Sequence, residues 1–192
     1  MAKRALIVID LQNDYFEGGQ FPLENIAAAA ANAARLQDAA RARGDLVVHV
    51  RHEFPTADAP FFAPNSKGSA INGAVLPRDG ETVLLKNAVN AFLGTGLKDV
   101  LDRNGITDVT VAGAMSHMCI DAAVRAAADY GYRTTVIHDA VATRDLAFDG
   151  TPVPAAQVHA AAMAALGFAY ATLLSTDAYL AAAEAPVGDS AA

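Results

Sequence analysis

Residues 5–10 read Ala-Leu-Ile-Val-Ile-Asp, five apolar residues closed by an acid. The apolar run is short and rich in β-branched side chains, and it does not alternate with polar residues. This pattern is typical of a strand buried on both faces of a parallel sheet. Similar short runs recur along the chain, separated by alanine-rich segments with apolar residues at helical spacing. The alternation predicts a three-layer α/β/α fold, with a doubly wound, six-stranded parallel sheet of Rossmann-like type.

The remaining elements are placed from the same signals. Strands are expected at residues 5–9, 46–50, 82–85, 108–112, 133–137 and 169–173. Helices are expected at residues 23–43, 97–104, 118–130, 154–166 and 176–183, and glycines stand at the usual C-cap places of the first four (44, 105, 131 and 167). Residues 53–80 are expected to form a long ordered loop, and such loops are usually functional. We expect one domain over residues 1–184 and a flexible C-terminal tail over residues 185–192.

Composition limits the possible functions. The 192 residues are 53% hydrophobic with a mean hydropathy of +0.23, which excludes a mainly disordered chain. The net charge of −7 lacks the basic footprint that a phosphate backbone needs, so no nucleic-acid partner is expected. The first apolar run is too short for a signal peptide or a membrane span. We therefore expect a cytoplasmic protein with no membrane partner.

Chemically useful side chains follow three of the expected strands. In a parallel sheet the active site lies beyond the carboxyl ends of the strands. Asp10 and Lys86 end the first and third strands, and the single cysteine, Cys119, comes soon after the fourth, at the start of a helix. A helix N-terminus lowers a thiol's pKa, so Cys119 is a candidate nucleophile, Asp10 its base, and Lys86 the cation that orients both. The simpler alternatives are a packing cysteine, a carboxylate that accepts loop N–H groups, and a lysine that extends to the surface.

Four stretches then point to a known family. Three stretches are the more specific: residues 8–16 (Val-Ile-Asp-Leu-Gln-Asn-Asp-Tyr-Phe), 86–92 (Lys-Asn-Ala-Val-Asn-Ala-Phe) and 111–120 (Val-Ala-Gly-Ala-Met-Ser-His-Met-Cys-Ile). The fourth, Asp139-Ala140 with Thr143, is weaker. Together they resemble the motifs of the isochorismatase-like cysteine hydrolases, a group that includes nicotinamidases and N-carbamoylsarcosine amidases. The resemblance runs from about residue 4 to 175.

The resemblance implies a mechanism. The catalytic triad would be Asp10, Lys86 and Cys119, and the Ala114–Met115 peptide bond would be cis. The backbone N–H groups of Met115 and Cys119 would form an oxyanion hole. Cys119 would attack a carbonyl carbon, Asp10 would protonate the leaving amine, and water would hydrolyse the thioester. No cofactor is implied.

Two departures narrow the substrate. Isochorismatases proper cleave a vinyl ether and commonly lack the cysteine, so Cys119 favours hydrolysis of an amide or related C–N bond. Nicotinamidases carry an Asp-x-His metal motif after the second strand, where this chain has His52 and Phe54. We therefore predict no metal and disfavour nicotinamide. His117 stands where the family often has Asp, and it would polarise a substrate, shape the pocket or cap the helix.

Further residues are candidates for binding a small-molecule substrate. They are Asn13, Phe16, His52, Phe61, Asn90, Phe92 and His117. The alternative for the loop phenylalanines is that they pack the loop on the domain or reach a neighbouring subunit. The resemblance implies a homo-oligomer, a dimer or tetramer, and the low charged fraction of 18% agrees. Of the other histidines, His49 is expected to be structural, His138 to pair with Asp139, and His159 to lie at an interface.

Two other functions stay open at this point. A vinyl-ether hydrolase would use Asp10 as its acid, with Cys119 incidental. A ligand-binding or redox-sensing protein would keep the fold without turnover. A dinucleotide-binding enzyme is disfavoured, because Gly18-Gly19 does not complete the glycine fingerprint after the first strand.

Overall fold

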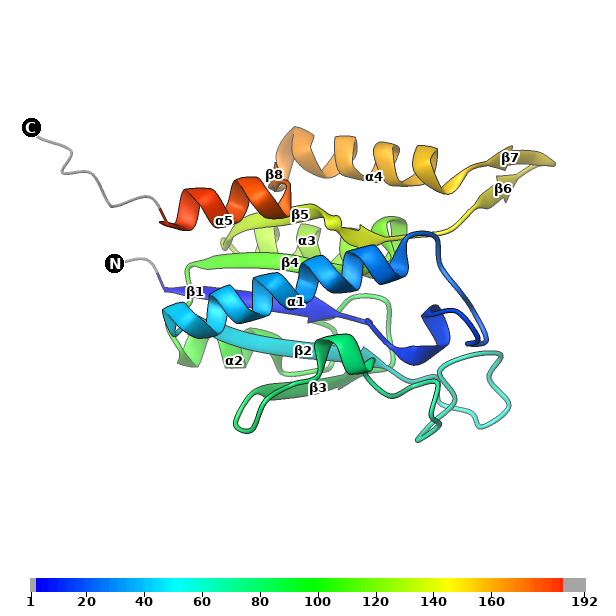
Figure 1. Ribbon diagram of the computed structural model, residues 1–192, viewed down its shortest axis with the longest axis horizontal. Coiled ribbons are helices and arrows are strands. Elements are labelled where there is room, and N and C mark those ends of the chain that lie inside the picture. Colours follow the sequence, from blue (N-terminus) through cyan, green and yellow to red (C-terminus); the bar gives the residue numbers. More distant parts are fainter. Residues whose placement is uncertain (1–2, 185–192) are drawn as a thin grey trace, which may run out of the picture.

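The computed structural model describes residues 3–184 and contains one large parallel sheet (Figure 1). Its strands stand in the order β3-β2-β1-β4-β5-β8, so the direction of winding reverses between β1 and β4. The predicted six-stranded, doubly wound sheet is confirmed. The strands are β1 (Arg4–Ile9), β2 (Leu46–His52), β3 (Thr82–Lys86), β4 (Asp108–Ala114), β5 (Arg133–Ala142) and β8 (Thr172–Leu174).

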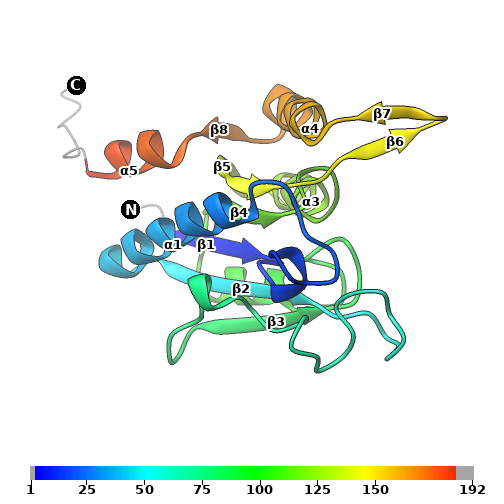
Figure 2. The ribbon, with the colours of Figure 1, turned by 45° about the vertical axis from the view of Figure 1, so that its right-hand side comes forward.

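Helices cover both faces of the sheet (Figures 1 and 2). One face carries α1 (Ile26–Arg43) and α5 (Thr176–Glu184). The other carries α2 (Leu97–Arg103), α3 (Asp121–Asp129) and α4 (Ala155–Ala169). In β1, Leu6 and Val8 pack toward α1, whereas alternate residues such as Ile7 pack toward the opposite layer, and all are nearly fully buried. Burial on both faces explains why the strand has no polar alternation.

The boundaries of helices α1 and α4 differ from the sequence prediction. Helix α1 begins at Ile26 and not at residue 23, because the Leu23 N–H donates to the Tyr15 carbonyl and Glu24 bridges to Thr143. Helix α4 continues through Gly167 to Ala169, so the expected cap and the strand start at residue 169 are wrong. A Cβ at Gly167 would lie 2.9 Å from the Leu173 side chain, so this glycine allows close packing against β8.

The polypeptide after the expected fifth strand is more ordered than predicted. Strand β5 continues to Ala142, and a hairpin follows, formed by β6 (Leu146–Phe148) and β7 (Thr151–Val153). Its turn is Asp149-Gly150, both at positive φ, a pair strongly preferred in two-residue hairpin turns. Sequence reasoning missed this signal. The hairpin projects at the end of the sheet where the strands terminate (Figure 1).

The long loop is ordered, as predicted. It contains one 3₁₀ turn, η2 (Gly73–Val75), and is attached to a second turn, η1 (Asn13–Tyr15), which follows β1. The Asp14 carboxylate accepts a hydrogen bond from the Phe62 N–H at 2.6 Å, and the Asp14 N–H donates to the Gly68 carbonyl. A Cβ at Gly68 would overlap the Asp14 carboxylate. The loop therefore approaches η1 as closely as a glycine allows.

Candidate functional site

Four side chains meet at the carboxyl ends of four adjacent strands. Lys86 ends β3, His52 ends β2, Asp10 follows β1, and Cys119 lies on the turn after β4. His52 and Lys86 are direct partners in the β2–β3 register. The site lies where the sheet reverses its winding, the usual position for a ligand site in such folds. All four residues are buried, with Asp10 and Lys86 no more than 1% exposed.

The Lys86 ammonium is at the centre of this cluster. Its Nζ lies 2.8 Å from Asp10 Oδ2, 3.2 Å from Cys119 Sγ, 3.0 Å from His52 Nδ1 and 3.1 Å from the Ala88 carbonyl oxygen. The structure therefore brings together the three residues predicted to be catalytic. It also adds His52, which was predicted only as a substrate contact.

The backbone around the nucleophile is unusual. The Ala114–Met115 peptide bond is cis, as the resemblance implies. A π-helical turn, η3 (Ser116–Ile120), follows it and carries Cys119, so the helix expected at residues 118–130 begins only at Asp121. Gly113 has a φ of 137°, and a Cβ there would overlap the Ile9 carbonyl. Only glycine lets β4 come this close to β1 beside Asp10.

Charge and burial set the protonation states. Burial, reinforced by the Asp10 charge, raises the pKa of the Cys119 thiol, and Lys86 only partly opposes this. The lowered pKa expected at a helix N-terminus is therefore not the net result, and Cys119 is a thiol in the resting protein. Burial acts to lower the pKa of Lys86, but the contacts with the Asp10 carboxylate and the Cys119 sulfur outweigh it and raise that pKa. Lys86 thus stays an ammonium.

Asp10 has the features of a proton acceptor. Its Oδ2 faces Lys86, whereas its Oδ1 is buried and has no hydrogen-bond partner among residues 3–184. A buried carboxylate oxygen without a donor is rare and requires an explanation. The Cys119 proton supplies one, because the raised pKa of the thiol makes an adjacent base necessary.

Gln12 fixes the position of His52, and sequence reasoning missed it. The fully buried Gln12 carboxamide donates to the carbonyls of His52 (2.8 Å) and Ser69 (2.7 Å) and accepts the His52 N–H at 2.7 Å. It therefore joins the end of β2 to the long loop. The available signal was its place in the motif at residues 8–16, two positions after Asp10.

A cavity of about 610 Å³ lies beside η3, the turn that carries Cys119 and is called the nucleophile turn below. Phe61 and His117, both predicted substrate contacts, line it. His117 Nδ1 lies 2.8 Å from Thr143 Oγ1, and burial, with the Arg144 charge, lowers the pKa of His117, so the ring is neutral. The Arg144 guanidinium lies 4.1 Å from the Phe21 ring centroid and was missed by sequence reasoning. The lining residues are Phe21, Phe61, Met115, His117, Met118, Arg144, Asp145, Leu146 and Ala147.

The structure does not place the other four predicted contacts in this lining. Asn13 and Phe16 line a separate hollow of about 420 Å³, and the Asn13 side chain bonds to the Lys67 carbonyl and to Asn72. Asn90 accepts the Phe92 N–H within its own turn. The Phe92 ring packs against Tyr130 and Tyr132 in the apolar cluster that contains Cys119. Their local bonds account for these residues without a substrate.

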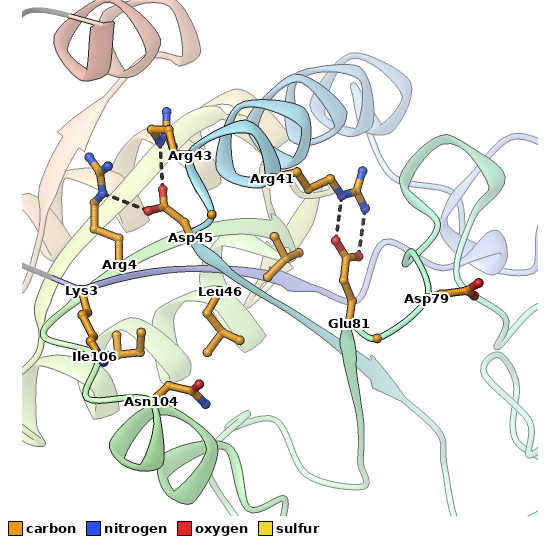
Figure 3. A pocket seen from close by; sticks show the side chains of 13 residues that line it. Lys3, Arg4, Arg41, Arg43, Asp45, Leu46, Asp79, Glu81, Asn104 and Ile106 are labelled. Carbon is orange, nitrogen blue, oxygen red and sulfur yellow. Dashed lines mark hydrogen bonds and ion pairs between the residues drawn. The ribbon is translucent and has the colours of Figure 1, made fainter.

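A hollow of about 700 Å³ lies at the opposite end of the sheet, where the strands begin (Figure 3). Its charged side chains neutralise one another: Arg41 bonds to Glu81 at 2.7 Å, and Asp45 accepts from both Arg4 and Arg43. Glu81 also bonds to the buried His49, which agrees with the structural role expected for that histidine. This end of the sheet is a network of ion pairs, remote from Cys119.

The two remaining histidines lie near the end of β5. His138 does not pair with Asp139, whose carboxylate accepts instead from the N–H and hydroxyl of Thr176. His159 Nδ1 lies 2.7 Å from Ser116 Oγ on the nucleophile turn. Within residues 3–184 no three potential metal ligands cluster together. Over the same range, no helix combines the length and the apolar character that crossing a bilayer requires.

The chain is a doubly wound α/β domain that brings a thiol, a carboxylate and an ammonium together at its switch point. The isochorismatase domain matches residues 4–178, and the chain belongs to the isochorismatase family of hydrolases.

Relatives and solved structures agree with this assignment. YddQ of Bacillus subtilis (strain 168), an isochorismatase family protein, is 46% identical over 176 residues, covering 92% of this chain and 98% of YddQ. An isochorismatase hydrolase structure from Oleispira antarctica is 52% identical with a TM-score of 0.91, covering 93% of this chain and 96% of that one. Maleamate amidohydrolase of Pseudomonas putida is 34% identical over 157 residues, covering 74% of this chain and 73% of the amidohydrolase.

Proposed function

We propose that the protein is a cysteine-dependent hydrolase that cleaves a small-molecule amide or related C–N bond through a thioester at Cys119. One observation carries the proposal: the buried Lys86 ammonium contacts both the Asp10 carboxylate and the Cys119 sulfur. A thiol, a carboxylate with a free oxygen and a fixed cation are the groups that nucleophilic catalysis by cysteine needs.

The chemistry follows from this arrangement. Asp10 takes the Cys119 proton as the sulfur attacks the carbonyl carbon, and Lys86 stabilises the negative charge on sulfur. The oxyanion is bound by the backbone N–H groups of Met115 and Cys119. When the C–N bond breaks, Asp10 gives its proton to the leaving amine. Asp10 then removes a proton from water, which attacks the thioester and releases the acid and the thiol.

The cavity indicates the kind of amide. Phe61, Met115 and Met118 give it an apolar wall, and Arg144 adds a cation. Arg144 donates only to the Asp145 backbone carbonyl, and it forms no ion pair among the described residues; the carboxylate of Asp145, which lines the same cavity, accepts the Ala155 N–H instead. We infer that the substrate carries an anionic group besides the amide. The relation to a maleamate amidohydrolase supports this inference.

The test is product release from a panel of small amides, ureides and carbamoyl acids, with maleamate and N-carbamoylsarcosine included. Ammonia and acid are measured for the wild type, Cys119→Ala and Cys119→Ser. We expect wild-type turnover and a loss of at least about a thousandfold in both variants, since nucleophile and base act as a unit. Equal turnover by wild type and Cys119→Ala would overturn the thioester and favour ether cleavage with Asp10 as acid.

A further inference from the structure

His52 has two ring nitrogens in different surroundings. Its Nδ1 lies 3.0 Å from Lys86 Nζ, whereas its Nε2 is buried with no hydrogen-bond partner among residues 3–184. The whole residue is only 8% exposed. The mechanism proposed above uses neither nitrogen, so this buried group has no assigned role.

The contact with Lys86 fixes the tautomer. An ammonium only donates hydrogen bonds, so Nδ1 must be the bare, accepting nitrogen. In a neutral imidazole the hydrogen then sits on Nε2. The ring therefore presents an acceptor to the catalytic cation and, on its other side, a buried donor without an acceptor.

Counting the donors of Lys86 shows what His52 does for it. An ammonium has three N–H groups, but four acceptors surround this one. The two neutral acceptors, His52 Nδ1 and the Ala88 carbonyl, occupy two of them. The third N–H group is left to point between Asp10 and Cys119. The negative charge moves from one of these residues to the other when the thiol gives its proton to the carboxylate.

The ring is held firmly enough for this task. Gln12 binds both the N–H and the carbonyl of His52, which fixes the end of β2. The Phe54 ring stands nearly perpendicular to the imidazole, at 72° and 4.8 Å between centroids. Phe54 in turn contacts Phe61, which lines the cavity beside the nucleophile turn. His52 thus contacts Lys86 on one side and is linked through Phe54 to Phe61 in the wall of that cavity.

We propose that His52 is a two-ended positioning residue. Its Nδ1 aims the third N–H of Lys86 at Asp10 and Cys119, and its Nε2–H receives an acceptor atom of the substrate, such as a carbonyl or carboxylate oxygen. The inference rests on the proposed hydrolase function. It assigns to this site a substrate with an acceptor placed to reach His52, in addition to the scissile carbonyl.

Two amide variants of His52 test the roles of its two ring nitrogens separately. In His52→Asn the side-chain oxygen replaces Nδ1, and in His52→Gln the side-chain nitrogen replaces Nε2. His52→Leu removes both groups, and His138→Asn is a matched control outside the site. Two readouts are used: the pH profile of Cys119 alkylation by iodoacetamide, followed by mass, and kcat and KM for the best amide of the panel.

We expect His52→Asn to keep the wild-type alkylation profile within about threefold while KM rises about tenfold or more. In His52→Gln we expect Cys119 to be alkylated more than tenfold more slowly near neutral pH. We expect the alkaline limb of its alkylation profile to move to lower pH, and KM to change less than in His52→Asn. The reason is that Lys86, which faces Asp10, His52 and Cys119, loses an acceptor and holds its proton less firmly. Equal effects of Asn and Gln on both readouts would overturn the proposal.

A measurement on the wild type avoids any folding defect of the variants. Nitrogen-15 NMR of the imidazole near neutral pH is expected to show a neutral ring with the Nε2–H tautomer of His52. A hydrogen on Nδ1 would overturn the proposal directly. Failure of the hydrolase function is distinguishable, because it would abolish turnover on the panel while leaving the alkylation and NMR results for His52 intact.

Discussion

At Asp10 the chain leaves β1 with a φ of 55°, and the carboxylate turns into a pocket where one oxygen meets Lys86 and the other meets no donor among residues 3–184. The side chain is fully buried. Such a carboxylate can accept the thiol proton at its free oxygen while Lys86 holds the other oxygen. The reactivity of Cys119 therefore depends on a neighbour more than on its own helix turn.

Asp10→Asn tests this dependence. The amide keeps the shape of Asp10 but cannot take a proton, so we expect turnover to fall by about a hundredfold to ten-thousandfold. Cys119 alkylation at neutral pH should slow as well, because the raised pKa of the thiol persists without a base. The measurement is kcat beside alkylation rate; normal alkylation in this variant would contradict the assigned role.

The same residues show how far sequence reasoning reaches. Asp10, Lys86 and Cys119 were predictable, because each follows an apolar run at the same edge of a parallel sheet. Gln12 and Arg144 were not, since their importance lies in contacts with residues distant along the chain. The free oxygen of Asp10 and the tautomer of His52 likewise depend on three-dimensional packing.

Among the elements, the positions of the strands could be predicted from apolar runs. Element boundaries were predicted wrongly where one type of residue, such as glycine, serves either as a helix cap or as a site of close packing. Gly167 was interpreted as a helix cap, but it packs against Leu173 inside α4. The Asp149-Gly150 hairpin was overlooked because its short strands are exposed and form no apolar run. Burial patterns reveal the core elements and say little about those at the surface.

Glycine at position 68 holds the long loop close to η1. In Gly68→Ala the new methyl group would displace the Asp14 carboxylate and break its bond with the Phe62 N–H. We expect a loss of about 1–3 kcal/mol in the free energy of unfolding and faster proteolysis within residues 53–80. Gly73→Ala is the control, because a Cβ there meets nothing within 4 Å. Equal behaviour of the two variants would show that the loop is not anchored at Asp14.

Glu81 links α1, β2 and β3 at the end of the sheet where the strands begin. Hydrogen bonds from Arg41, and further ones from Arg78 and His49, hold the pKa of Glu81 at about 2, below its ordinary value of 4.5. A depressed pKa stabilises the fold above about pH 4.5, and this contribution is lost as the pH falls toward 2. We expect Glu81→Gln to cost about 2 kcal/mol at pH 7. Urea unfolding at pH 7 and pH 3 should show that cost shrinking; an unchanged difference would contradict it.

For the whole molecule, the outer surface of α4 is unusually apolar. Phe168 is 91% exposed, and the neighbouring outward residues are alanines (Ala160, Ala161, Ala164 and Ala165). Phe148, on the hairpin, is 81% exposed. Large exposed apolar side chains are typical of interaction sites, which supports the proposed homo-oligomer.

The oligomer is testable by light scattering after size exclusion. We expect the wild type to be a dimer or tetramer and Phe168→Ser to shift it toward the monomer. Leu93→Ser, at another side chain that is 65% exposed, is the control and should leave the assembly unchanged. A monomeric wild type would contradict the proposal.

The order of the strands has a consequence for how new specificities arise in this chain. The groups proposed to react all come from residues 10–119, at the ends of four adjacent strands, whereas residues 144–147, which run from the end of β5 into the hairpin, form part of the cavity wall. Part of the recognition surface thus lies outside the segment that carries the chemistry, although Phe21, Phe61, Met115, His117 and Met118 lie within it. Recombination or directed evolution confined to the segment from β5 to α4 would change which molecules enter, while the bond-breaking apparatus is inherited intact.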